Sequence, residues 1–390
     1  MTSPLHPETL AIRGARAGSG YGEHSQALFL TSSFTYDTAE EARALFLGET
    51  EGFTYTRTAN PTVSAFAARM AQLEKAESGV ATASGMAAIQ ATLMALLQAG
   101  DHVVTSKSLF GTTIGLLNTL PAYGIEVTFV AQTDVSAWQA AMRPNTKMLL
   151  LETPSNPLGE IADIVALAQM AHAAGALLAV DNCFCSPALQ QPIALGADLS
   201  IQSATKAIDG QGRVMGGAVC GSAALIEIIF KHVRTAGQIM SPFNAWVLLS
   251  GLETLYVRME KQCANALILA QWLQTCPQVE AVYYPGLPEH PQAELVRQQQ
   301  SAGGIVVTFA VKGGQAEAWQ VVDALNIFSR TGNLGDVKST VTHPFTTTHA
   351  RVEPAEKIAT GITPNLLRLS IGLEHIDDLR ADLQQALDQL

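Results

Sequence analysis

The chain has 390 residues, of which 48% are hydrophobic and 15% are charged. This composition is typical of a globular protein with a large core, and the length favours two domains. Lys and Arg number 23 against 34 Asp and Glu, which gives a formal net charge of −11. An acidic chain without a basic tract argues against a nucleic-acid surface, although local arginines can still bind an anionic small molecule.

The N-terminal segment MTSPLHPETL contains neither a cationic region nor an apolar one, so no secretory signal is expected. The most apolar stretch, residues 164–180, is interrupted by polar residues and a glycine, which argues against a membrane span. The five cysteines are too few and too scattered for a disulfide scaffold. The C-x-C pair at Cys183 and Cys185 lacks the second pair that a zinc site normally needs. We therefore expect a cytoplasmic protein with structural thiols and no metal.

Residues 1 to about 55 carry many glycines among polar residues and are expected to be irregular. A helix is predicted to begin after Asn60-Pro61-Thr62, because proline suits a first helical turn. From about residue 78 to residue 250, short apolar segments alternate with helical ones. The predicted strands contain residues 103–104, 127–130, 148–151, 177–180, 199–201 and 218–220, and predicted helices include 87–98 and 164–174. This alternation predicts an α/β domain with a mostly parallel sheet.

The last third of the chain has a different pattern. The expected elements are a long helix at 259–273, a strand at 304–311, a helix at 315–324, a strand at 366–371 and a closing helix from Asp377. These elements predict a smaller α+β domain. We therefore divide the chain into an N-terminal arm at residues 1–57, an α/β domain at 58–254 and a C-terminal α+β domain at 255–390.

The segment Ser203-Ala204-Thr205-Lys206 follows an apolar run that ends in Asp181. Ligands of open parallel sheets bind at the carboxyl ends of strands, which places Asp181 at a ligand site. A lysine can form a Schiff base with the aldehyde of pyridoxal 5'-phosphate (PLP), and an aspartate can keep the pyridinium nitrogen protonated. Ser203 and Thr205 offer hydroxyls to a phosphate ester. These residues predict a PLP site in which Lys206, once freed, is a general base.

Two other segments suit an anion but also have ordinary interpretations. Ser84, Gly85 and Met86 precede a predicted helix, whose N-terminal amides and dipole favour phosphate, although Ser84 could be a plain N-cap. Tyr55 and Arg57 are two residues apart, so both side chains would point the same way in an extended segment. The Arg57 guanidinium suits a phosphate, but taken alone an exposed surface pair is the simpler interpretation.

Arg368 lies in the apolar segment Leu366–Ser370, and a buried arginine needs a partner. That partner could be a structural ion pair or a substrate carboxylate. Phe110 could be a core aromatic or could stack on a flat cofactor ring. His343 and His349 are too far apart for a helical metal pair and are expected to be loop residues around the site.

Together, these segments resemble the transsulfuration family of fold-type I PLP enzymes, and the resemblance covers nearly the whole chain. It implies a large, mostly parallel sheet with helices on both faces, followed by a smaller C-terminal α+β domain. It also implies that Lys206 carries PLP and that Asp181 pairs with the pyridinium. The residues implied to hold the phosphate are Ser84, Gly85, Met86, Ser203 and Thr205.

The resemblance assigns further roles around this centre. Tyr55 and Arg57 would reach the phosphate of a neighbouring subunit, which implies catalytic dimers within a homotetramer, and Tyr55 is a candidate for proton transfer. Asn156, in the segment ETPSNP, would lie near the cofactor phenolic oxygen and the substrate carboxylate. Arg368 would bind that carboxylate, and Ser339 is expected to contact the substrate.

Phe110 departs from most of the family, which has tyrosine there, so the ring can stack but has no hydroxyl for proton transfer. Three segments resemble the O-succinylhomoserine sulfhydrylase branch, which also tends to carry phenylalanine: residues 234–246, 333–339 and 342–349. Lyases of the family usually have an acidic residue where Lys338 stands. The implied reaction is γ-replacement, in which sulfide displaces succinate from O-succinylhomoserine and gives homocysteine for methionine biosynthesis.

Three alternatives remain open from the sequence. Cystathionine γ-synthase shares the first half of the reaction but uses cysteine as the nucleophile, and a methionine or cystathionine γ-lyase would let water hydrolyse the intermediate. A PLP-binding regulator without catalysis is the alternative from a different class, against which Lys206, Asp181 and Arg368 argue. The acyl group of the homoserine ester is also left open.

Overall fold

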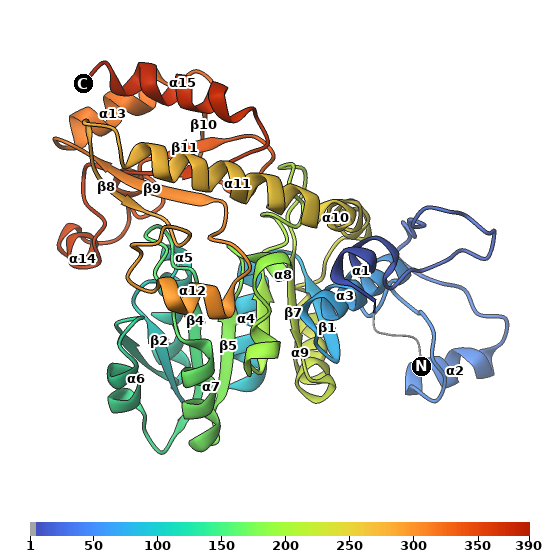
Figure 1. The fold of residues 1–390 in the computed structure, drawn as a ribbon. Helices are drawn as coiled ribbons and strands as arrows, with labels where there is room; N and C mark the ends of the chain where they lie inside the picture. Colours follow the sequence, from blue (N-terminus) through green and yellow to red (C-terminus); the bar gives the residue numbers. More distant parts are fainter. Residues whose placement is uncertain (1–4) are drawn as a thin grey trace.

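The computed structural model describes residues 5–390, and the first four residues of the predicted arm lie outside the described residues. A seven-stranded sheet has the order β1-β7-β6-β5-β4-β2-β3 (Figure 1). Its strands are β1 (Ser78–Thr82), β2 (His102–Ser106), β3 (Glu126–Val130), β4 (Thr146–Glu152), β5 (Leu177–Asp181), β6 (Leu199–Gln202) and β7 (Gly217–Gly221). Strand β7 runs antiparallel to its neighbours β1 and β6, and the other neighbours are parallel. The predicted α/β fold with a mostly parallel sheet is therefore confirmed.

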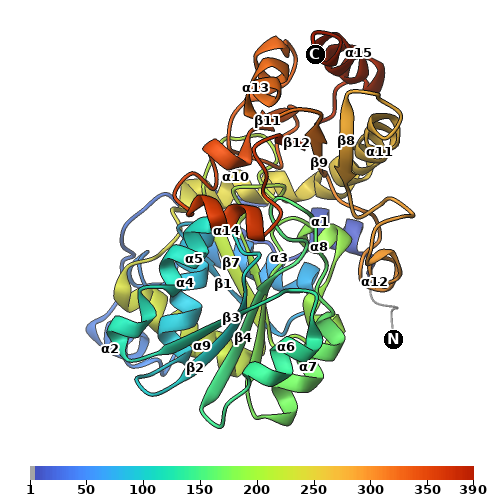
Figure 2. The ribbon, with the colours of Figure 1, turned by 90° about the vertical axis from the view of Figure 1, so that its left-hand side faces the viewer.

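Helices cover both faces of this sheet, with α4 and α9 on one side and α6 and α7 on the other (Figure 2). The helices of this part are α3 (Pro61–Glu74), α4 (Gly85–Leu96), α5 (Gly111–Leu117), α6 (Val135–Ala141), α7 (Ile164–Ala173), α8 (Ser186–Leu189) and α9 (Ala223–Ala236). Strand β4 is a continuous apolar run because helices cover both of its faces. Met148 and Leu150 pack into the core on the α4 face, whereas Leu149 and Leu151 pack into the core on the α7 face.

A second, five-stranded sheet has the order β10-β11-β12-β9-β8. Its strands are β8 (Val279–Tyr283), β9 (Val306–Val311), β10 (Ser329–Arg330), β11 (Thr340–Thr342) and β12 (Leu366–Ser370). The accompanying helices are α10 (Pro242–Glu253), α11 (Leu255–Leu273), α12 (Ala293–Gln299), α13 (Gln315–Ala324), α14 (Pro354–Ala359) and α15 (Ile376–Leu387). Alternate residues of β9 and β12, including Phe309 and Leu367, form one core with α11, α13 and α15.

The expectation that residues 1 to about 55 are irregular is wrong in two places. Helix α1 (Pro7–Arg13) begins with proline in its first turn, and α2 (Ala39–Leu47) begins after Thr38, whose side chain accepts a hydrogen bond from the N–H of Glu41. Helix α2 buries none of its residues, so it has no buried stripe that would have marked it in the sequence. Helix α10 and strands β1, β8, β10 and β11 were also not predicted.

None of the helices within residues 5–390 combines the length and apolarity needed to cross a bilayer. Among the side chains that the structure describes, no group of three or more His, Cys, Asp or Glu is arranged to hold a metal ion. All five cysteines are free thiols, and four of them are buried.

Candidate active site

The predicted catalytic residues lie where neighbouring strands of the large sheet end. Asp181 is the last residue of β5 and is in register with Glu152, the last residue of β4. Lys206 lies in the turn that follows the next strand, β6. Its Nζ donates a hydrogen bond of 2.6 Å to Oδ1 of Asn333, which comes from the loop between β10 and β11. The site therefore lies between the two sheets, and both contribute residues to it.

The surroundings shift the pKa values of both central groups. Burial raises the pKa of Asp181 to about 7, and the N–H of Cys183, which donates to its Oδ1 at 3.1 Å, acts in the opposite direction. Burial also lowers the pKa of Lys206, while the Cys183 thiolate would raise it and the charge of Arg368 lowers it further. A lysine with a lowered pKa has more neutral amine at neutral pH, and neutral amine is the form that attacks an aldehyde or accepts a proton.

A cradle suited to phosphate forms where α4 begins. Ser84 is the N-cap of α4, as the ordinary interpretation of this motif expected, and the helix N-terminus also offers backbone N–H groups. A Cβ on Gly85 would lie only 2.6 Å from the Cβ of Ser203, so these two segments are in contact and leave no room for a side chain. Thr205 accepts a hydrogen bond from the N–H of Gly216 at 3.1 Å. The structure thus brings Ser84, Gly85, Ser203 and Thr205 to one place.

Phe110 is held at the end of β4 by a backbone contact. It is half-buried and directly precedes α5. Its N–H donates a hydrogen bond of 2.8 Å to Oε2 of Glu152. Because Glu152 is in register with Asp181, this bond fixes the phenylalanine beside the strand end that carries the aspartate.

Arg368, in β12, is 1% exposed and has polar but uncharged partners. Its Nη1 donates to Oδ1 of Asn156 at 3.1 Å, and its Nη2 donates to the carbonyls of Gly332 and Asn333 at 2.8 and 3.3 Å. Its Nε has no hydrogen-bond partner, and none of the described Asp and Glu side chains forms an ion pair with it. Burial lowers the pKa of Arg368 to about 10, although the charge of Glu152 opposes this shift. A structural ion pair is therefore not observed, and the guanidinium is available to a carboxylate.

A hollow of about 1120 Å³ opens beside this cluster and is lined by Met86, Asn156 and His349, among others. Asn156 connects the hollow to Arg368 by a hydrogen bond, and Asn333 connects Arg368 to Lys206. Burial and the charge of Arg368 lower the pKa of His349 to about 4, so its imidazole is neutral at physiological pH. The histidine therefore contributes a polar but uncharged wall.

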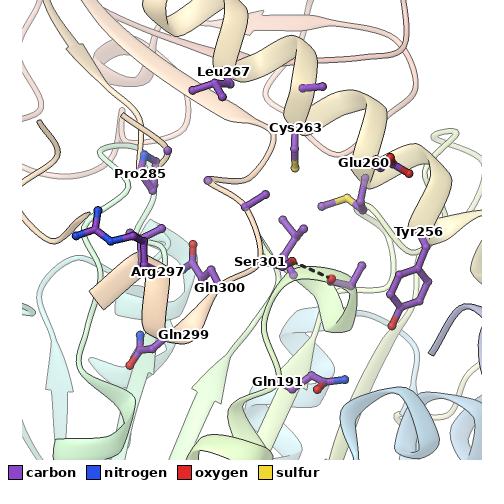
Figure 3. Close-up of a pocket in the computed structure, with 18 of the residues that line it drawn as sticks. Gln191, Tyr256, Glu260, Cys263, Leu267, Pro285, Arg297, Gln299, Gln300 and Ser301 are labelled. Carbon is purple, nitrogen blue, oxygen red and sulfur yellow. Dashed lines mark hydrogen bonds between the residues drawn. The ribbon is translucent and has the colours of Figure 1, made fainter. Parts of the chain in front are cut away.

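A second hollow of about 990 Å³ lies between α8, α11 and α12 (Figure 3). Its labelled lining includes Gln191, Tyr256, Cys263 and Arg297. None of the residues predicted from the sequence to bind cofactor or substrate lines this second hollow. Of the predicted site residues, Met86 and Asn156 line the first hollow, so this hollow borders the candidate active site.

Three other predicted residues have partners of their own. Tyr55 is 45% exposed, and the Arg57 guanidinium lies 5.5 Å from its ring centroid and donates to the carbonyl of Arg234 at 2.7 Å. The segment forms a turn after Tyr55 rather than the extended conformation expected, and neither side chain lines the first hollow of this chain. Ser339 is buried, and its hydroxyl donates to Oε2 of Glu374 at 2.8 Å. Its predicted contact with substrate stays a prediction.

Sequence reasoning missed two residues of this cluster, Asn333 and Glu152. Asn333 belongs to a segment whose Gly335 packs so tightly on Lys206 that a Cβ there would lie 3.1 Å from the lysine Cα. Glu152 offered the same signal as Asp181, because both are acidic residues at the carboxyl end of an apolar strand.

The residues fit a bound PLP on chemical grounds. Lys206 has the lowered pKa that suits linkage to an aldehyde, and Asp181 supplies a carboxylate for a ring nitrogen. The close contact between Gly85 and Ser203 lies at the N-terminus of α4, where backbone N–H groups can bind a phosphate. The unpaired Nε of buried Arg368 leaves a donor for a carboxylate.

Comparison with known proteins agrees with this chemistry. Residues 8–388 match the family described as Cys/Met metabolism PLP-dependent enzyme. The chain is 53% identical over 384 residues to O-succinylhomoserine sulfhydrylase of Pseudomonas aeruginosa, covering 98% of this chain and 95% of that protein. It is 43% identical over 384 residues to L-methionine gamma-lyase of Pseudomonas putida, covering 97% of this chain and 96% of that protein.

A solved structure has the same fold along nearly its whole length. It is cystathionine gamma synthase of Xanthomonas oryzae pv. oryzae in complex with aminoacrylate and cysteine, with a TM-score of 0.95 and 36% identity over 99% of both chains. The resemblance inferred from the sequence motifs is thereby confirmed. The chain belongs to the family of Cys/Met metabolism PLP-dependent enzymes, and its cofactor is PLP.

Proposed function

We propose that the protein catalyses γ-replacement on O-succinylhomoserine, with sulfide as the nucleophile and with homocysteine and succinate as products. The observation that carries this proposal is the chain of contacts from Asn156 through Arg368 and Asn333 to Lys206. It joins a guanidinium whose Nε lacks a partner, and which can bind the substrate α-carboxylate, to an amine that can move protons. The choice of substrate is supported by 53% identity to a protein named O-succinylhomoserine sulfhydrylase.

The proposal assigns each part of the cofactor to residues described above. Lys206 would link to the aldehyde, Asp181 would pair with the ring nitrogen and Phe110 would lie against the ring. The residues that hold the phosphate are Ser84, Gly85, Met86, Ser203 and Thr205. When bound, PLP supplies a ring that accepts electrons from the carbon atoms beside the substrate amino group.

The side chains of this protein then bind the substrate and move its protons. Arg368 and Asn156 hold the α-carboxylate, which orients the Cα–H bond toward Lys206. The Lys206 amine takes the proton from Cα, and a second proton passes from Cβ to one of the two candidate proton carriers, Lys206 or Tyr55, as succinate departs from Cγ. After sulfide adds at Cγ, Lys206 returns protons to carbon. Phe110 has no hydroxyl and cannot transfer a proton, so Tyr55 is the remaining candidate for proton transfer besides Lys206.

We also propose that Tyr55 and Arg57 act on the phosphate of a neighbouring subunit in a catalytic dimer within a homotetramer. The N-terminal arm supports this, because it exposes Tyr21 (94%), Leu30 (69%) and Phe46 (71%), and such exposed apolar residues are typical of interfaces. We propose as well that the chain consists of an N-terminal arm, an α/β domain and a C-terminal α+β domain, at residues 1–57, 58–254 and 255–390. We also propose that the protein is cytoplasmic.

Product identification after incubation with O-succinylhomoserine tests the reaction. Three samples contain sulfide, cysteine or neither, and we expect homocysteine and succinate to form fastest with sulfide. A clear preference for cysteine would make the protein a cystathionine γ-synthase, the activity named for the solved structure at 36% identity. Release of 2-oxobutyrate and ammonia without a nucleophile would make it a γ-lyase, as is the relative at 43% identity.

A non-catalytic PLP-binding regulator makes a separate prediction. Its cofactor absorbance would not change with any amino acid or homoserine ester. We expect O-succinylhomoserine to change the visible spectrum at once, because the intact Lys206 and Arg368 place an exchangeable amine beside a carboxylate site.

A further inference from the structure

Two carboxyl groups lie side by side at the base of the site. Glu152 and Asp181 are the last residues of two adjacent parallel strands and are paired in register. Neighbouring strands lie about 4.8 Å apart, and residues in register point to the same face of the sheet. Glu152 is 3% exposed and Asp181 is half-buried. Two carboxylates this close and this poorly solvated cannot both ionise without a large cost.

The groups around Glu152 decide which carboxyl keeps a proton. They are Asp181 on β5, Arg368 on β12 and the Cys183 thiol. The charge of Lys206 in turn acts on the Cys183 thiol. Burial and the negative charge of Asp181 raise the pKa of Glu152 well above its usual range, and the Phe110 N–H and Arg368 only partly oppose this. Asp181 has to be ionised to pair with a protonated ring nitrogen, so the remaining proton resides on Glu152.

We propose that Glu152 is a positioning residue, uncharged beside ionised Asp181, that anchors Phe110 against the cofactor ring through the hydrogen bond from the Phe110 backbone. This inference rests on the cofactor-site assignment of the proposed function. A protonated carboxyl still has a carbonyl oxygen that accepts the 2.8 Å bond from Phe110. Glu152 thus fixes the aromatic ring without adding a second negative charge beneath the cofactor.

Two substitutions separate charge from anchoring. Glu152→Gln keeps a neutral group with an oxygen that can accept the Phe110 bond, whereas Glu152→Met keeps the volume but offers only a weak acceptor. Exposed Glu289 provides the matched control, Glu289→Gln. Each holoenzyme is titrated by the visible absorbance of the cofactor linked to Lys206. Cofactor Kd is measured by adding PLP back to the apoprotein.

We expect Glu152→Gln to keep the midpoint of the absorbance titration within about 0.3 pH units and the cofactor Kd within about threefold of the unsubstituted protein. Glu152→Met should also keep the midpoint but bind PLP about tenfold more weakly, because the buried N–H of Phe110 loses its acceptor. The visible circular dichroism of the cofactor should fall in this variant. Far-UV circular dichroism of the apoproteins checks that each variant folds.

A midpoint lowered by one pH unit or more in Glu152→Gln would overturn the proposal, because it would mean that a negative charge had been removed. Equal Kd and circular dichroism in the two Glu152 variants would overturn the anchoring role. The Lys206→Ala variant tests the site assignment independently of the role of Glu152. If Lys206 carries the cofactor, this variant lacks the absorbance band of the lysine-linked cofactor. A protein that shows the expected titrations but no sulfhydrylase activity would sink the proposed reaction and leave the role of Glu152 standing.

Discussion

Replacing Glu74 with glutamine should stabilise the protein at alkaline pH, because this carboxyl is buried and has no cationic partner. Glu74 is the last residue of α3 and is fully buried. Its Oε1 accepts hydrogen bonds from the side-chain amides of Gln202 at 2.6 Å and Asn182 at 3.4 Å, whereas its Oε2 has no partner. Burial raises the pKa of Glu74 to about 7, and these hydrogen bonds only partly oppose the shift.

The raised pKa sets both the sign and the size of the effect. Between the ordinary value of 4.5 and about 7, the carboxyl of Glu74 ionises in the unfolded chain but stays protonated in the folded one. Stability therefore falls as the pH rises through this window and is lowest above pH 7. The difference in pKa corresponds to about 3 kcal/mol per subunit. At roughly 2.1 cal/mol/K of unfolding entropy per residue, that corresponds to a change in Tm of about 4 °C.

Thermal melting of the PLP-saturated proteins at pH 5 and pH 8.5 measures this effect. Glu74→Gln keeps the acceptor for the Gln202 amide but cannot ionise. Its Tm relative to the unsubstituted protein should rise by about 3 °C between pH 5 and pH 8.5, since most of the penalty accumulates in that interval. The exposed Glu289→Gln variant should show no such change. A Tm difference for Glu74→Gln that is the same at both pH values would refute this reasoning.

The remaining predictions concern the proposed site. Lys206→Ala should lose the visible cofactor band and at least about 1000-fold in turnover, measured by absorbance and homocysteine release. Arg368→Lys should lower kcat/KM for O-succinylhomoserine about 100-fold with the cofactor spectrum unchanged, because the bidentate contact is lost. Phe110→Ala should weaken PLP binding about tenfold, whereas Phe110→Tyr should bind within threefold of the original. Tyr55→Phe should lower kcat about tenfold or more if its hydroxyl moves a proton.

The elements that could be predicted from the sequence are those with a clear hydrophobic pattern within their own segment. Strand β4 is a run of apolar residues because its neighbours cover both faces, and β12 and α13 have equally clear patterns. The expected helix at 315–324 has the bounds of α13 itself, Gln315–Ala324. Local composition is sufficient in such cases because the burial of each residue follows from its own segment.

The elements that were missed lack such a local pattern. Helix α2 exposes Phe46 and Leu47, so its apolar residues do not mark a buried face in this chain. Strands β10 and β11 have only two and three residues, which is too short for an alternation to be recognised. Their existence depends on pairing with other strands, because β11 pairs with β12, which comes later in the chain, and β10 pairs with β11.

In the candidate site too, contacts between distant segments could not be predicted from the sequence. Residues within short motifs, such as Lys206 with Ser203 and Thr205, carry their chemistry in the local sequence. The contact between Lys206 and Asn333 joins residues 127 positions apart, so only the packing of one sheet on the other reveals it.

The most informative property of Arg368 is that no acidic side chain in the described part of the chain forms an ion pair with it. Its residue type and apolar strand predict burial, but they fit an internal ion pair as well as a substrate carboxylate. The structure argues against an internal ion pair, because the guanidinium donates to Asn156 and to two backbone carbonyls rather than to a described carboxylate. A buried cation that has only neutral hydrogen-bond partners is poorly solvated until an anion binds, which supports our proposal that the substrate carboxylate supplies the missing charge.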